Sequence, residues 1–272
     1  MFEGVGELLG DPPGAILRDG RAGDVPVQWL DFPEHDMGSD APIVFYVHGG
    51  AYAMGSIVAS RHAAATHIRA LGGSGLVVGY RLAPEHPFPA AVDDVCMAWN
   101  WLLDEVDPAR VVALGESAGG GLLIAAMTRL RDQGTPLPAA AVTVSAWANL
   151  SNNTPSYTQN RRRDLALNPA LLEHAAQAYA GATERTHPEM SPVHGDLAGL
   201  PPLLLAVGTD EVVWDDTIEL HRRAVKAGVN ARLLIGERQL HCWTGYTDML
   251  PAARDAVRQI ADFGREHVAH QH

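Results

Sequence analysis

The chain has 272 residues, of which 47% are hydrophobic and 19% are charged, and its formal net charge is −12 at pH 7. These proportions are typical of a globular protein with an ample apolar core. A strongly acidic chain is poorly suited to bind nucleic acid or an anionic membrane surface, so we expect neither as a partner. Two cysteines are too few for a disulfide framework, and neither has the spacing of a metal site.

The first residues, Met-Phe-Glu-Gly-Val-Gly-Glu, lack the basic start and apolar core of a signal peptide. No stretch approaches the roughly 18 uninterrupted apolar residues of a membrane span. We therefore expect a cytoplasmic protein with reduced thiols.

Predicted strands and helices alternate along most of the chain. Residues 1–24 are rich in Gly, Pro and Asp without a sustained period, and we expect them to form a loosely packed arm. The apolar, β-rich runs predict strands at 25–32, 42–47, 75–80, 110–114, 139–145, 202–207 and 231–235. Runs of strong helix formers predict helices at 57–71, 90–103, 122–130, 169–179, 214–227 and 251–266. This alternation favours right-handed crossovers and a mostly parallel sheet.

The alternation breaks between residues 149 and 200, where the sequence is polar, carries three consecutive arginines and closes in prolines and glycines. An insertion of this kind at the mouth of a sheet is typical of a lid. The sequence therefore predicts one α/β domain over residues 1–272, with 1–24 and 149–200 contributing a small cap.

The stretch Gly-Glu-Ser-Ala-Gly-Gly at 115–120 lies between a predicted strand and a predicted helix. Flanking glycines let the backbone turn sharply, so that the hydroxyl of Ser117 stands clear of the sheet at the head of a helix. A serine that merely caps a helix is the alternative for the bare pattern. The position between strand and helix favours a nucleophile elbow.

An acidic residue and a histidine follow the last two predicted strands. Asp210 comes after the strand at 202–207, and His241 comes after the strand at 231–235. Open α/β sheets place ligands beyond the carboxyl ends of their strands. Asp215 and Asp216 should fall in the first turn of the next helix, where acids complement the helix dipole, so we expect Asp210 to face the imidazole.

Together these motifs resemble the hormone-sensitive-lipase-like branch of the α/β-hydrolases, the bacterial esterases with a His-Gly-Gly-Gly motif. The matching stretches are 47–52, 80–91, 115–120, 210–216 and 241–243. The order Ser117, Asp210, His241 is the order of α/β-hydrolases. The resemblance implies an α/β-hydrolase fold, with a mostly parallel central sheet flanked by helices, and these three residues as nucleophile, orienting carboxylate and base.

The resemblance also implies an oxyanion hole made by the backbone N–H groups of Gly50, Ala51 and Ala118. Two residues depart from the family pattern: Ala51 replaces the third glycine of the first motif, and Glu116 replaces the usual Asp. The short segment before His48 suggests a more open pocket. His48 itself would be structural.

The implied reaction is hydrolysis of short- to medium-chain carboxylic esters through an acyl-enzyme, with no metal or organic cofactor. A lactone hydrolase or a deacetylase would use the same residues. A non-enzymatic small-molecule receptor is a weaker alternative because His241 is present, and an interaction protein would not need all three triad residues.

Four aromatic residues are candidates for the pocket wall, with burial in the core as an equal alternative: Tyr52, Trp147, Trp214 and Trp243. The expected partner is a small ester or lactone. In relatives the last helix and its neighbouring strand form a common dimer surface, and a homodimer is a further expectation.

Overall fold

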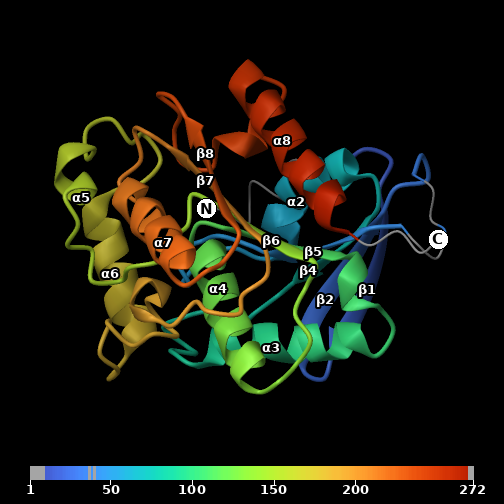
Figure 1. Cartoon of the computed structure of the whole chain (residues 1–272), viewed down its shortest axis with the longest axis horizontal. Helices are drawn as coiled ribbons and strands as arrows, with labels where there is room; N and C mark the ends of the chain where they lie inside the picture. Colours follow the sequence, from blue (N-terminus) through green and yellow to red (C-terminus); the bar gives the residue numbers. More distant parts are fainter. Residues whose placement is uncertain (1–9, 36–37, 39–40, 269–272) are drawn as a thin grey trace.

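The computed structural model describes residues 10–35, 38 and 41–268. Eight strands in these residues form one sheet in the order β1-β2-β4-β3-β5-β6-β7-β8 (Figure 1). Their bounds are β1 Ile16–Ala22, β2 Val25–Asp31, β3 Ile43–Val47, β4 Ser74–Val78, β5 Val111–Glu116, β6 Ala140–Val144, β7 Leu203–Gly208 and β8 Ala231–Gly236. The pairs β1–β2 and β2–β4 are antiparallel, and all other neighbours run parallel.

Helices cover both faces of this sheet (Figure 1). Their bounds are α2 Ile57–Leu71, α3 Ala90–Leu103, α4 Ala118–Asp132, α5 Ser156–Gln159, α6 Pro169–Ala180, α7 Trp214–Lys226 and α8 Pro251–His267. Short 3-10 turns are η1 Pro108–Arg110, η2 Pro192–His194 and η3 Trp243–Gly245. Helices α2 and α8 pack together over one face, whereas α3, α4 and α7 cover the other. None of the described helices is long and apolar enough to cross a membrane.

The central strands β3 to β7 are buried along their whole length. Because helices lie on both faces, each central strand is a continuous apolar run in the sequence. Such runs are easily recognised, which is why the sequence predicts these strands. Two apolar cores result, one under each helix layer. The mostly parallel α/β-hydrolase architecture expected from the sequence is confirmed.

The expectation of a loosely packed arm over residues 1–24 is wrong for Ile16–Ala22, which form the edge strand β1. The strand reads as polar because it lies at the sheet edge, where charged side chains block pairing with other chains. Arg18 forms an ion pair of 2.8 Å with Asp31 of β2. Residues 1–9, and any part they have in a cap, lie outside the described residues.

Four loops leave the carboxyl edge of the sheet close together, because β3, β5, β6, β7 and β8 are parallel neighbours. These loops follow β3, β5, β7 and β8, and they carry the residues that the sequence singles out. The segment 149–200 lies beside α7 and contains α5 and α6 (Figure 1).

Candidate active site

Ser117 lies on a tight turn between β5 and α4. Its backbone has φ 53° and ψ −123°, a conformation that side-chain-bearing residues rarely adopt. A Cβ at Gly115 would lie 2.4 Å from the carbonyl oxygen of Gly119, and one at Gly119 would lie 2.3 Å from the carbonyl oxygen of Val47. The flanking glycines are therefore required by close backbone approach, as in a nucleophile elbow.

The imidazole of His241 lies between the serine hydroxyl and a carboxylate. Its Nε2 is 2.8 Å from Oγ of Ser117, and its Nδ1 is 2.8 Å from Oε2 of Glu211. All three residues are buried. With the proton on Nδ1 donated to the carboxylate, Nε2 is free to accept the serine proton, which is the geometry of general-base activation.

The expectation that Asp210 faces His241 is wrong, because Glu211 takes that place. A turn brings the N–H of Glu211 to the carbonyl of Gly208 at 3.2 Å and folds the Glu211 side chain back beneath the loop. A Cβ at Gly208 would lie 3.0 Å from Oε1 of Glu211, so the missing side chain makes room for the carboxylate. Asp215 and Asp216 lie in the first turn of α7, as expected.

The sequence held a signal for this outcome in the glycine that ends β7. In the four-residue turn 208–211, Glu211 is the fourth residue, and its side chain is directed back to His241. Glutamate also reaches one methylene further than aspartate. Only the geometry of the turn shows which of the two adjacent acids, Asp210 or Glu211, orients the imidazole of His241.

The Glu211 carboxylate is held by groups besides His241. Oε1 accepts the N–H of Gly208 at 2.5 Å and the hydroxyl of Ser145 at 2.8 Å. The same Ser145 hydroxyl oxygen accepts the N–H of Cys242 at 2.9 Å, which ties the acid to the loop that carries His241. These bonds fix the direction of the carboxylate toward Nδ1.

The segment 149–200 holds the same loop from outside. The Asn160 amide donates to the carbonyls of Thr209 and Glu211 at 3.1 and 2.8 Å. The Asp164 carboxylate accepts the N–H of Val212 at 2.9 Å and also the N–H of Leu167 at 2.9 Å. Asp164 therefore links the acid loop to the part of the segment that reaches the cavity.

Burial and charge shift the titration of this pair. Burial raises the pKa of Glu211, against hydrogen bonds from His241, Gly208 and Ser145 that lower it. Burial alone would lower the pKa of His241, but the neighbouring Cys242 and Glu211 groups outweigh it, so this pKa lies well above its ordinary value. The carboxylate thus stabilises the imidazolium that forms when the serine proton is taken.

The three expected oxyanion donors lie near Ser117 with their N–H groups unused. Among the described residues no acceptor takes the N–H of Gly50, Ala51 or Ala118. Gly50 has φ 124°, and a Cβ there would lie 2.0 Å from the carbonyl oxygen of Met54, so this position requires glycine. Ala51 has φ 52°, a left-handed conformation that glycine adopts more readily.

His48 supports this loop and has no part in the relay. Its Nδ1 donates to the carbonyl of Gly49 at 2.7 Å, and its ring stacks on Tyr80 with centroids 4.2 Å apart. Burial lowers the pKa of His48 to about 4, so the ring is neutral near pH 7.

A cavity of about 290 Å³ opens above Ser117 and His241. Its other wall residues come from the loop after β3, from α2, from the segment 149–200 and from the loop after β8: Tyr46, Gly49, Gly50, Ala51, Met54, Gly55, Ala59, Ser60, Ala63, Glu116, Ala166, Leu167, Leu171, Leu172, Cys242 and Tyr246.

The four aromatic residues expected in the pocket wall are absent from it, and those expectations are wrong. Tyr52 stacks on Tyr179 in the core with centroids 3.9 Å apart. The Trp147 indole is fully buried and donates to Asn152, while Trp243 is buried in the core under α8. Trp214 begins α7. Large rings gain more from complete burial than from a half-exposed wall. The cavity is lined mainly by small and aliphatic residues, with Tyr46 and Tyr246 as its aromatic members.

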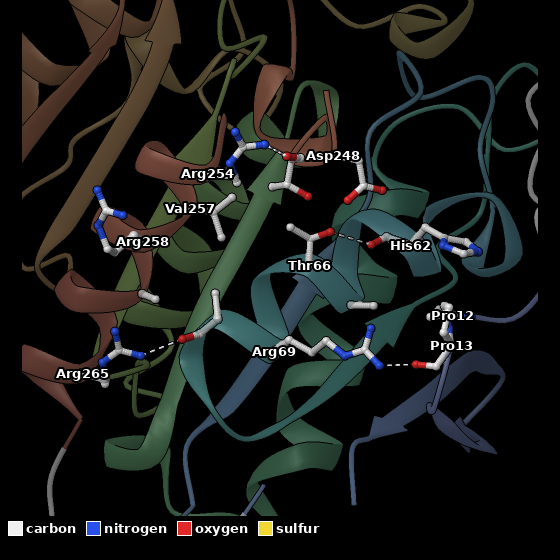
Figure 2. A pocket seen from close by; sticks show the side chains of 14 residues that line it. Pro12, Pro13, His62, Thr66, Arg69, Asp248, Arg254, Val257, Arg258 and Arg265 are labelled. Carbon is white, nitrogen blue, oxygen red and sulfur yellow. Dashed lines mark hydrogen bonds between the residues drawn. The ribbon is translucent and has the colours of Figure 1, made fainter. Parts of the chain in front are cut away.

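A larger cavity of about 610 Å³ lies between α2 and α8 and has no triad residue in its wall (Figure 2). The four arginines around it have partners nearby. Arg69, Arg254 and Arg265 donate to the carbonyls of Pro13, Thr247 and Ala70, and Arg258 donates to the Asp255 carboxylate. The smaller cavity is therefore the candidate active site. In the described residues, no group of three or more His, Cys, Asp or Glu side chains could hold a metal ion.

Comparison with known proteins identifies the family of this chain. Residues 44–245 match the family model described as the alpha/beta hydrolase fold. The chain belongs to the hormone-sensitive-lipase-like branch of this family.

Several proteins similar to this chain have names that state a reaction. An acetyl-hydrolase of Streptomyces hygroscopicus is 41% identical over 258 residues, which is 94% of this chain and 84% of that protein. An esterase of Acinetobacter venetianus is 29% identical over 83% of this chain and 75% of its own length. A solved esterase of the bacterial hormone-sensitive lipase family superposes with a TM-score of 0.93 at 36% identity, covering 98% of this chain and 90% of that one.

Replacing Glu211 by Gln should lower kcat by about 10³- to 10⁴-fold, because the amide cannot stabilise the imidazolium. Since the carboxylate raises the pKa of His241, and the base works only when neutral, the acid limb of kcat/KM should also move to lower pH. Steady-state kinetics from pH 5 to 9 measures both effects.

Asp210→Asn is the matched control, because it removes the neighbouring charge and leaves the Glu211 bond in place. We expect its kcat to stay within about threefold of the parent. A loss in Asp210→Asn comparable to that in Glu211→Gln would return the orienting role to Asp210.

A second buried carboxylate joins α7 to the start of the segment 149–200. Oδ2 of Asp216 accepts the N–H groups of Ala148 and Asn149 at 3.2 and 3.0 Å and the hydroxyl of Tyr157 at 3.2 Å. Burial raises the pKa of Asp216 from 3.8 to about 8. Between these two pH values the folded state holds a proton that the unfolded state has lost.

The contribution of Asp216 to stability should therefore be complete below about pH 4 and should fall as pH rises to about 8, by up to about 1.4 kcal/mol per pH unit. Asp216→Asn cannot lose the proton. We would measure the free energy of unfolding of parent and variant with urea at pH 5, 6.5 and 8. As pH rises, the parent should lose stability relative to the variant. Parallel curves would show that Asp216 titrates normally.

Proposed function

We propose that this protein hydrolyses carboxylic esters of short to medium acyl chain length through an acyl-enzyme formed on Ser117. The observation that carries the proposal is the continuous hydrogen-bonded relay from Ser117 through His241 to Glu211, with bonds of 2.8 Å at both ends of the imidazole. Ester hydrolysis is the reaction of the branch to which the chain belongs, and on that ground the protein is a carboxylic-ester hydrolase.

The steps follow from the geometry. His241 Nε2 takes the hydroxyl proton of Ser117 as Oγ attacks the ester carbonyl, and Glu211 stabilises the resulting imidazolium. The imidazolium then gives its proton to the leaving alcohol. Water, deprotonated by the same Nε2, attacks the acyl-enzyme and releases the acid and the free serine.

The oxyanion of each tetrahedral intermediate would be held by the backbone N–H groups of Gly50, Ala51 and Ala118. Their unused hydrogen-bonding capacity supports this role. Removing one oxyanion donor in an enzyme typically costs about 3 kcal/mol of transition-state stabilisation. Three fixed amides could therefore supply much of the rate enhancement.

The size of the cavity supports the proposed chain length. Its volume of about 290 Å³ lies at the lower end of the range for small-molecule sites, which is about 300 to 1,000 Å³. A butyryl group fits with a small alcohol, whereas a palmitoyl chain would have to leave the cavity. The segment 149–200 would act as a cap, since it supplies Ala166, Leu167, Leu171 and Leu172 to the wall.

Acetyl is the acyl group that the comparisons favour, because a relative covering nearly the whole chain is named an acetyl-hydrolase. A lactone hydrolase or a deacetylase would use the same three residues. The homodimer through α8 and β8 and the cytoplasmic location remain predictions from the sequence.

Hydrolysis of p-nitrophenyl acetate, butyrate and palmitate tests the proposal. We expect kcat/KM to be higher for acetate and butyrate than for palmitate, because the palmitoyl chain exceeds the cavity. Ser117→Ala should abolish turnover with an unchanged circular dichroism spectrum. Turnover of palmitate equal to that of butyrate, or a remaining p-nitrophenol burst in Ser117→Ala, would refute the proposal.

Ala51 lines the cavity, and its backbone N–H has no acceptor among the described residues, so its methyl group should shape the pocket while its N–H serves the oxyanion. Ala51→Gly should raise kcat/KM for bulky esters of tertiary alcohols relative to small acetates, because the methyl is removed and the N–H is kept. The ratio of the two rates is the measurement. An equal rise for every ester would mean that the methyl strains the oxyanion loop and leaves pocket shape unaffected.

A further inference from the structure

The two sides of the catalytic cavity differ in chemistry. On one side Met54, Leu167 and Leu172 pack with the core that lies under α3, α4 and α7, and they offer only apolar surface. On the other side lie Glu116 and Tyr46, the latter belonging to the core under α2 and α8. A charged group in the wall of a small catalytic cavity affects which substrates can enter it.

The Glu116 carboxylate is fixed in position by two hydrogen bonds. Its Oε2 accepts the hydroxyl of Tyr46 at 2.7 Å, and its Oε1 lies 3.2 Å from Nε2 of His67. Among the described residues Nδ1 of His67 has no partner, so the ring proton is assigned to Nε2, where it is donated to Glu116. Both carboxylate oxygens of Glu116 therefore accept a hydrogen bond, and the side chain is held in one orientation at the cavity wall.

Among the described residues of the cavity wall, only His241 can carry a positive charge, and it is already paired with Glu211. The Glu116 side chain is largely buried, and 9% of its surface is exposed. The residue lines the cavity. The chain as a whole carries a net charge of −12, which adds to the attraction of a cation.

An aromatic ring lies in the same wall. Tyr246 is 45% exposed and lines the cavity together with Cys242, five and one residues after His241. A fixed carboxylate with an exposed aromatic ring is an environment that favours an alkylammonium group, through Coulomb attraction and cation–π contact.

This wall belongs to the alcohol side of the site. The leaving alkoxide must receive its proton from Nε2 of His241, so the alcohol part of the ester lies against the loop that carries this histidine. Cys242 and Tyr246 are on that loop. The acyl part is then directed toward the apolar wall formed by Leu167 and Leu172.

We propose that Glu116, with Tyr246, selects the charge of the alcohol part, so that esters of alcohols bearing an alkylammonium group are preferred and esters of alcohols bearing a carboxylate are rejected. The inference deepens the proposed ester hydrolysis and rests on it. Glu116 acts here as a specificity-determining residue, which takes no part in bond making.

Acetylcholine and its neutral isostere, in which a tert-butyl group replaces the trimethylammonium group, test the proposal as a matched pair. The parent protein should show kcat/KM for acetylcholine about tenfold or more above that for the isostere. The acetate ester of a hydroxy acid of similar length should react about tenfold or more slowly than the isostere. In Glu116→Gln the preference for acetylcholine should fall by about tenfold, whatever the absolute rates.

Two further variants separate specificity from structure. Glu105→Gln removes one exposed carboxylate at the end of α3 and should leave the preference unchanged. Tyr246→Leu removes the aromatic ring with its wall volume largely kept, and it should lower the preference by about threefold.

An unchanged preference in Glu116→Gln, or a uniform loss of rate on all esters, would overturn the inference. A second pair of ethyl esters carries the same trimethylammonium or tert-butyl group on the acid. A preference that appears only in that pair would overturn the assignment to the alcohol side. If the parent hydrolyses the neutral esters but shows no charge preference, this inference is wrong and the proposed function stands. If the parent hydrolyses no ester at all, the proposed function is wrong.

Discussion

The rest of the site depends on the hydrogen bond between Glu211, in the loop after β7, and His241, in the loop after β8. Both side chains are buried. Without partners a carboxylate at this depth would lose most of its hydration and gain nothing in return. The N–H of Gly208 and the hydroxyl of Ser145 provide such partners, and Asn160 and Asp164 hold the loop from the segment 149–200. The segment 149–200 and the loop that carries Glu211 are therefore held together as one structure.

The opposite end of the relay depends on close backbone approach. The loops after β3 and β5 touch where Gly119 meets the carbonyl of Val47, and this contact brings the amides of Gly50 and Ala51 beside Ser117. Both Ser117 and Ala51 adopt left-handed backbone angles, each costing about 1 kcal/mol or more. Strands β3 and β5, which precede these two loops, are fully buried, and this burial offsets the cost of the strained backbone angles.

Most of the fold could be predicted from the sequence because the central strands are apolar on both faces and the helices are well marked. The edge strand Ile16–Ala22 could not, since its polar residues suit an exposed edge. The rule that ligands lie beyond the carboxyl ends of strands located Ser117 and His241. It could not choose between Asp210 and Glu211, because a turn of four residues decides which side chain points inward. Nor could it show that Tyr52 and Trp243 face the cores, since sequence alone does not give the direction of a loop side chain.

Proton NMR of the imidazole Nδ1–H reports directly on the bond between Glu211 and His241, because a proton held between a buried imidazole and a carboxylate resonates far downfield and exchanges slowly with water. We expect this resonance in the parent protein and in Asp210→Asn, and its loss or a large upfield shift in Glu211→Gln. A resonance that persists unchanged in Glu211→Gln, or disappears in Asp210→Asn, would show that Glu211 is not the partner of the imidazole.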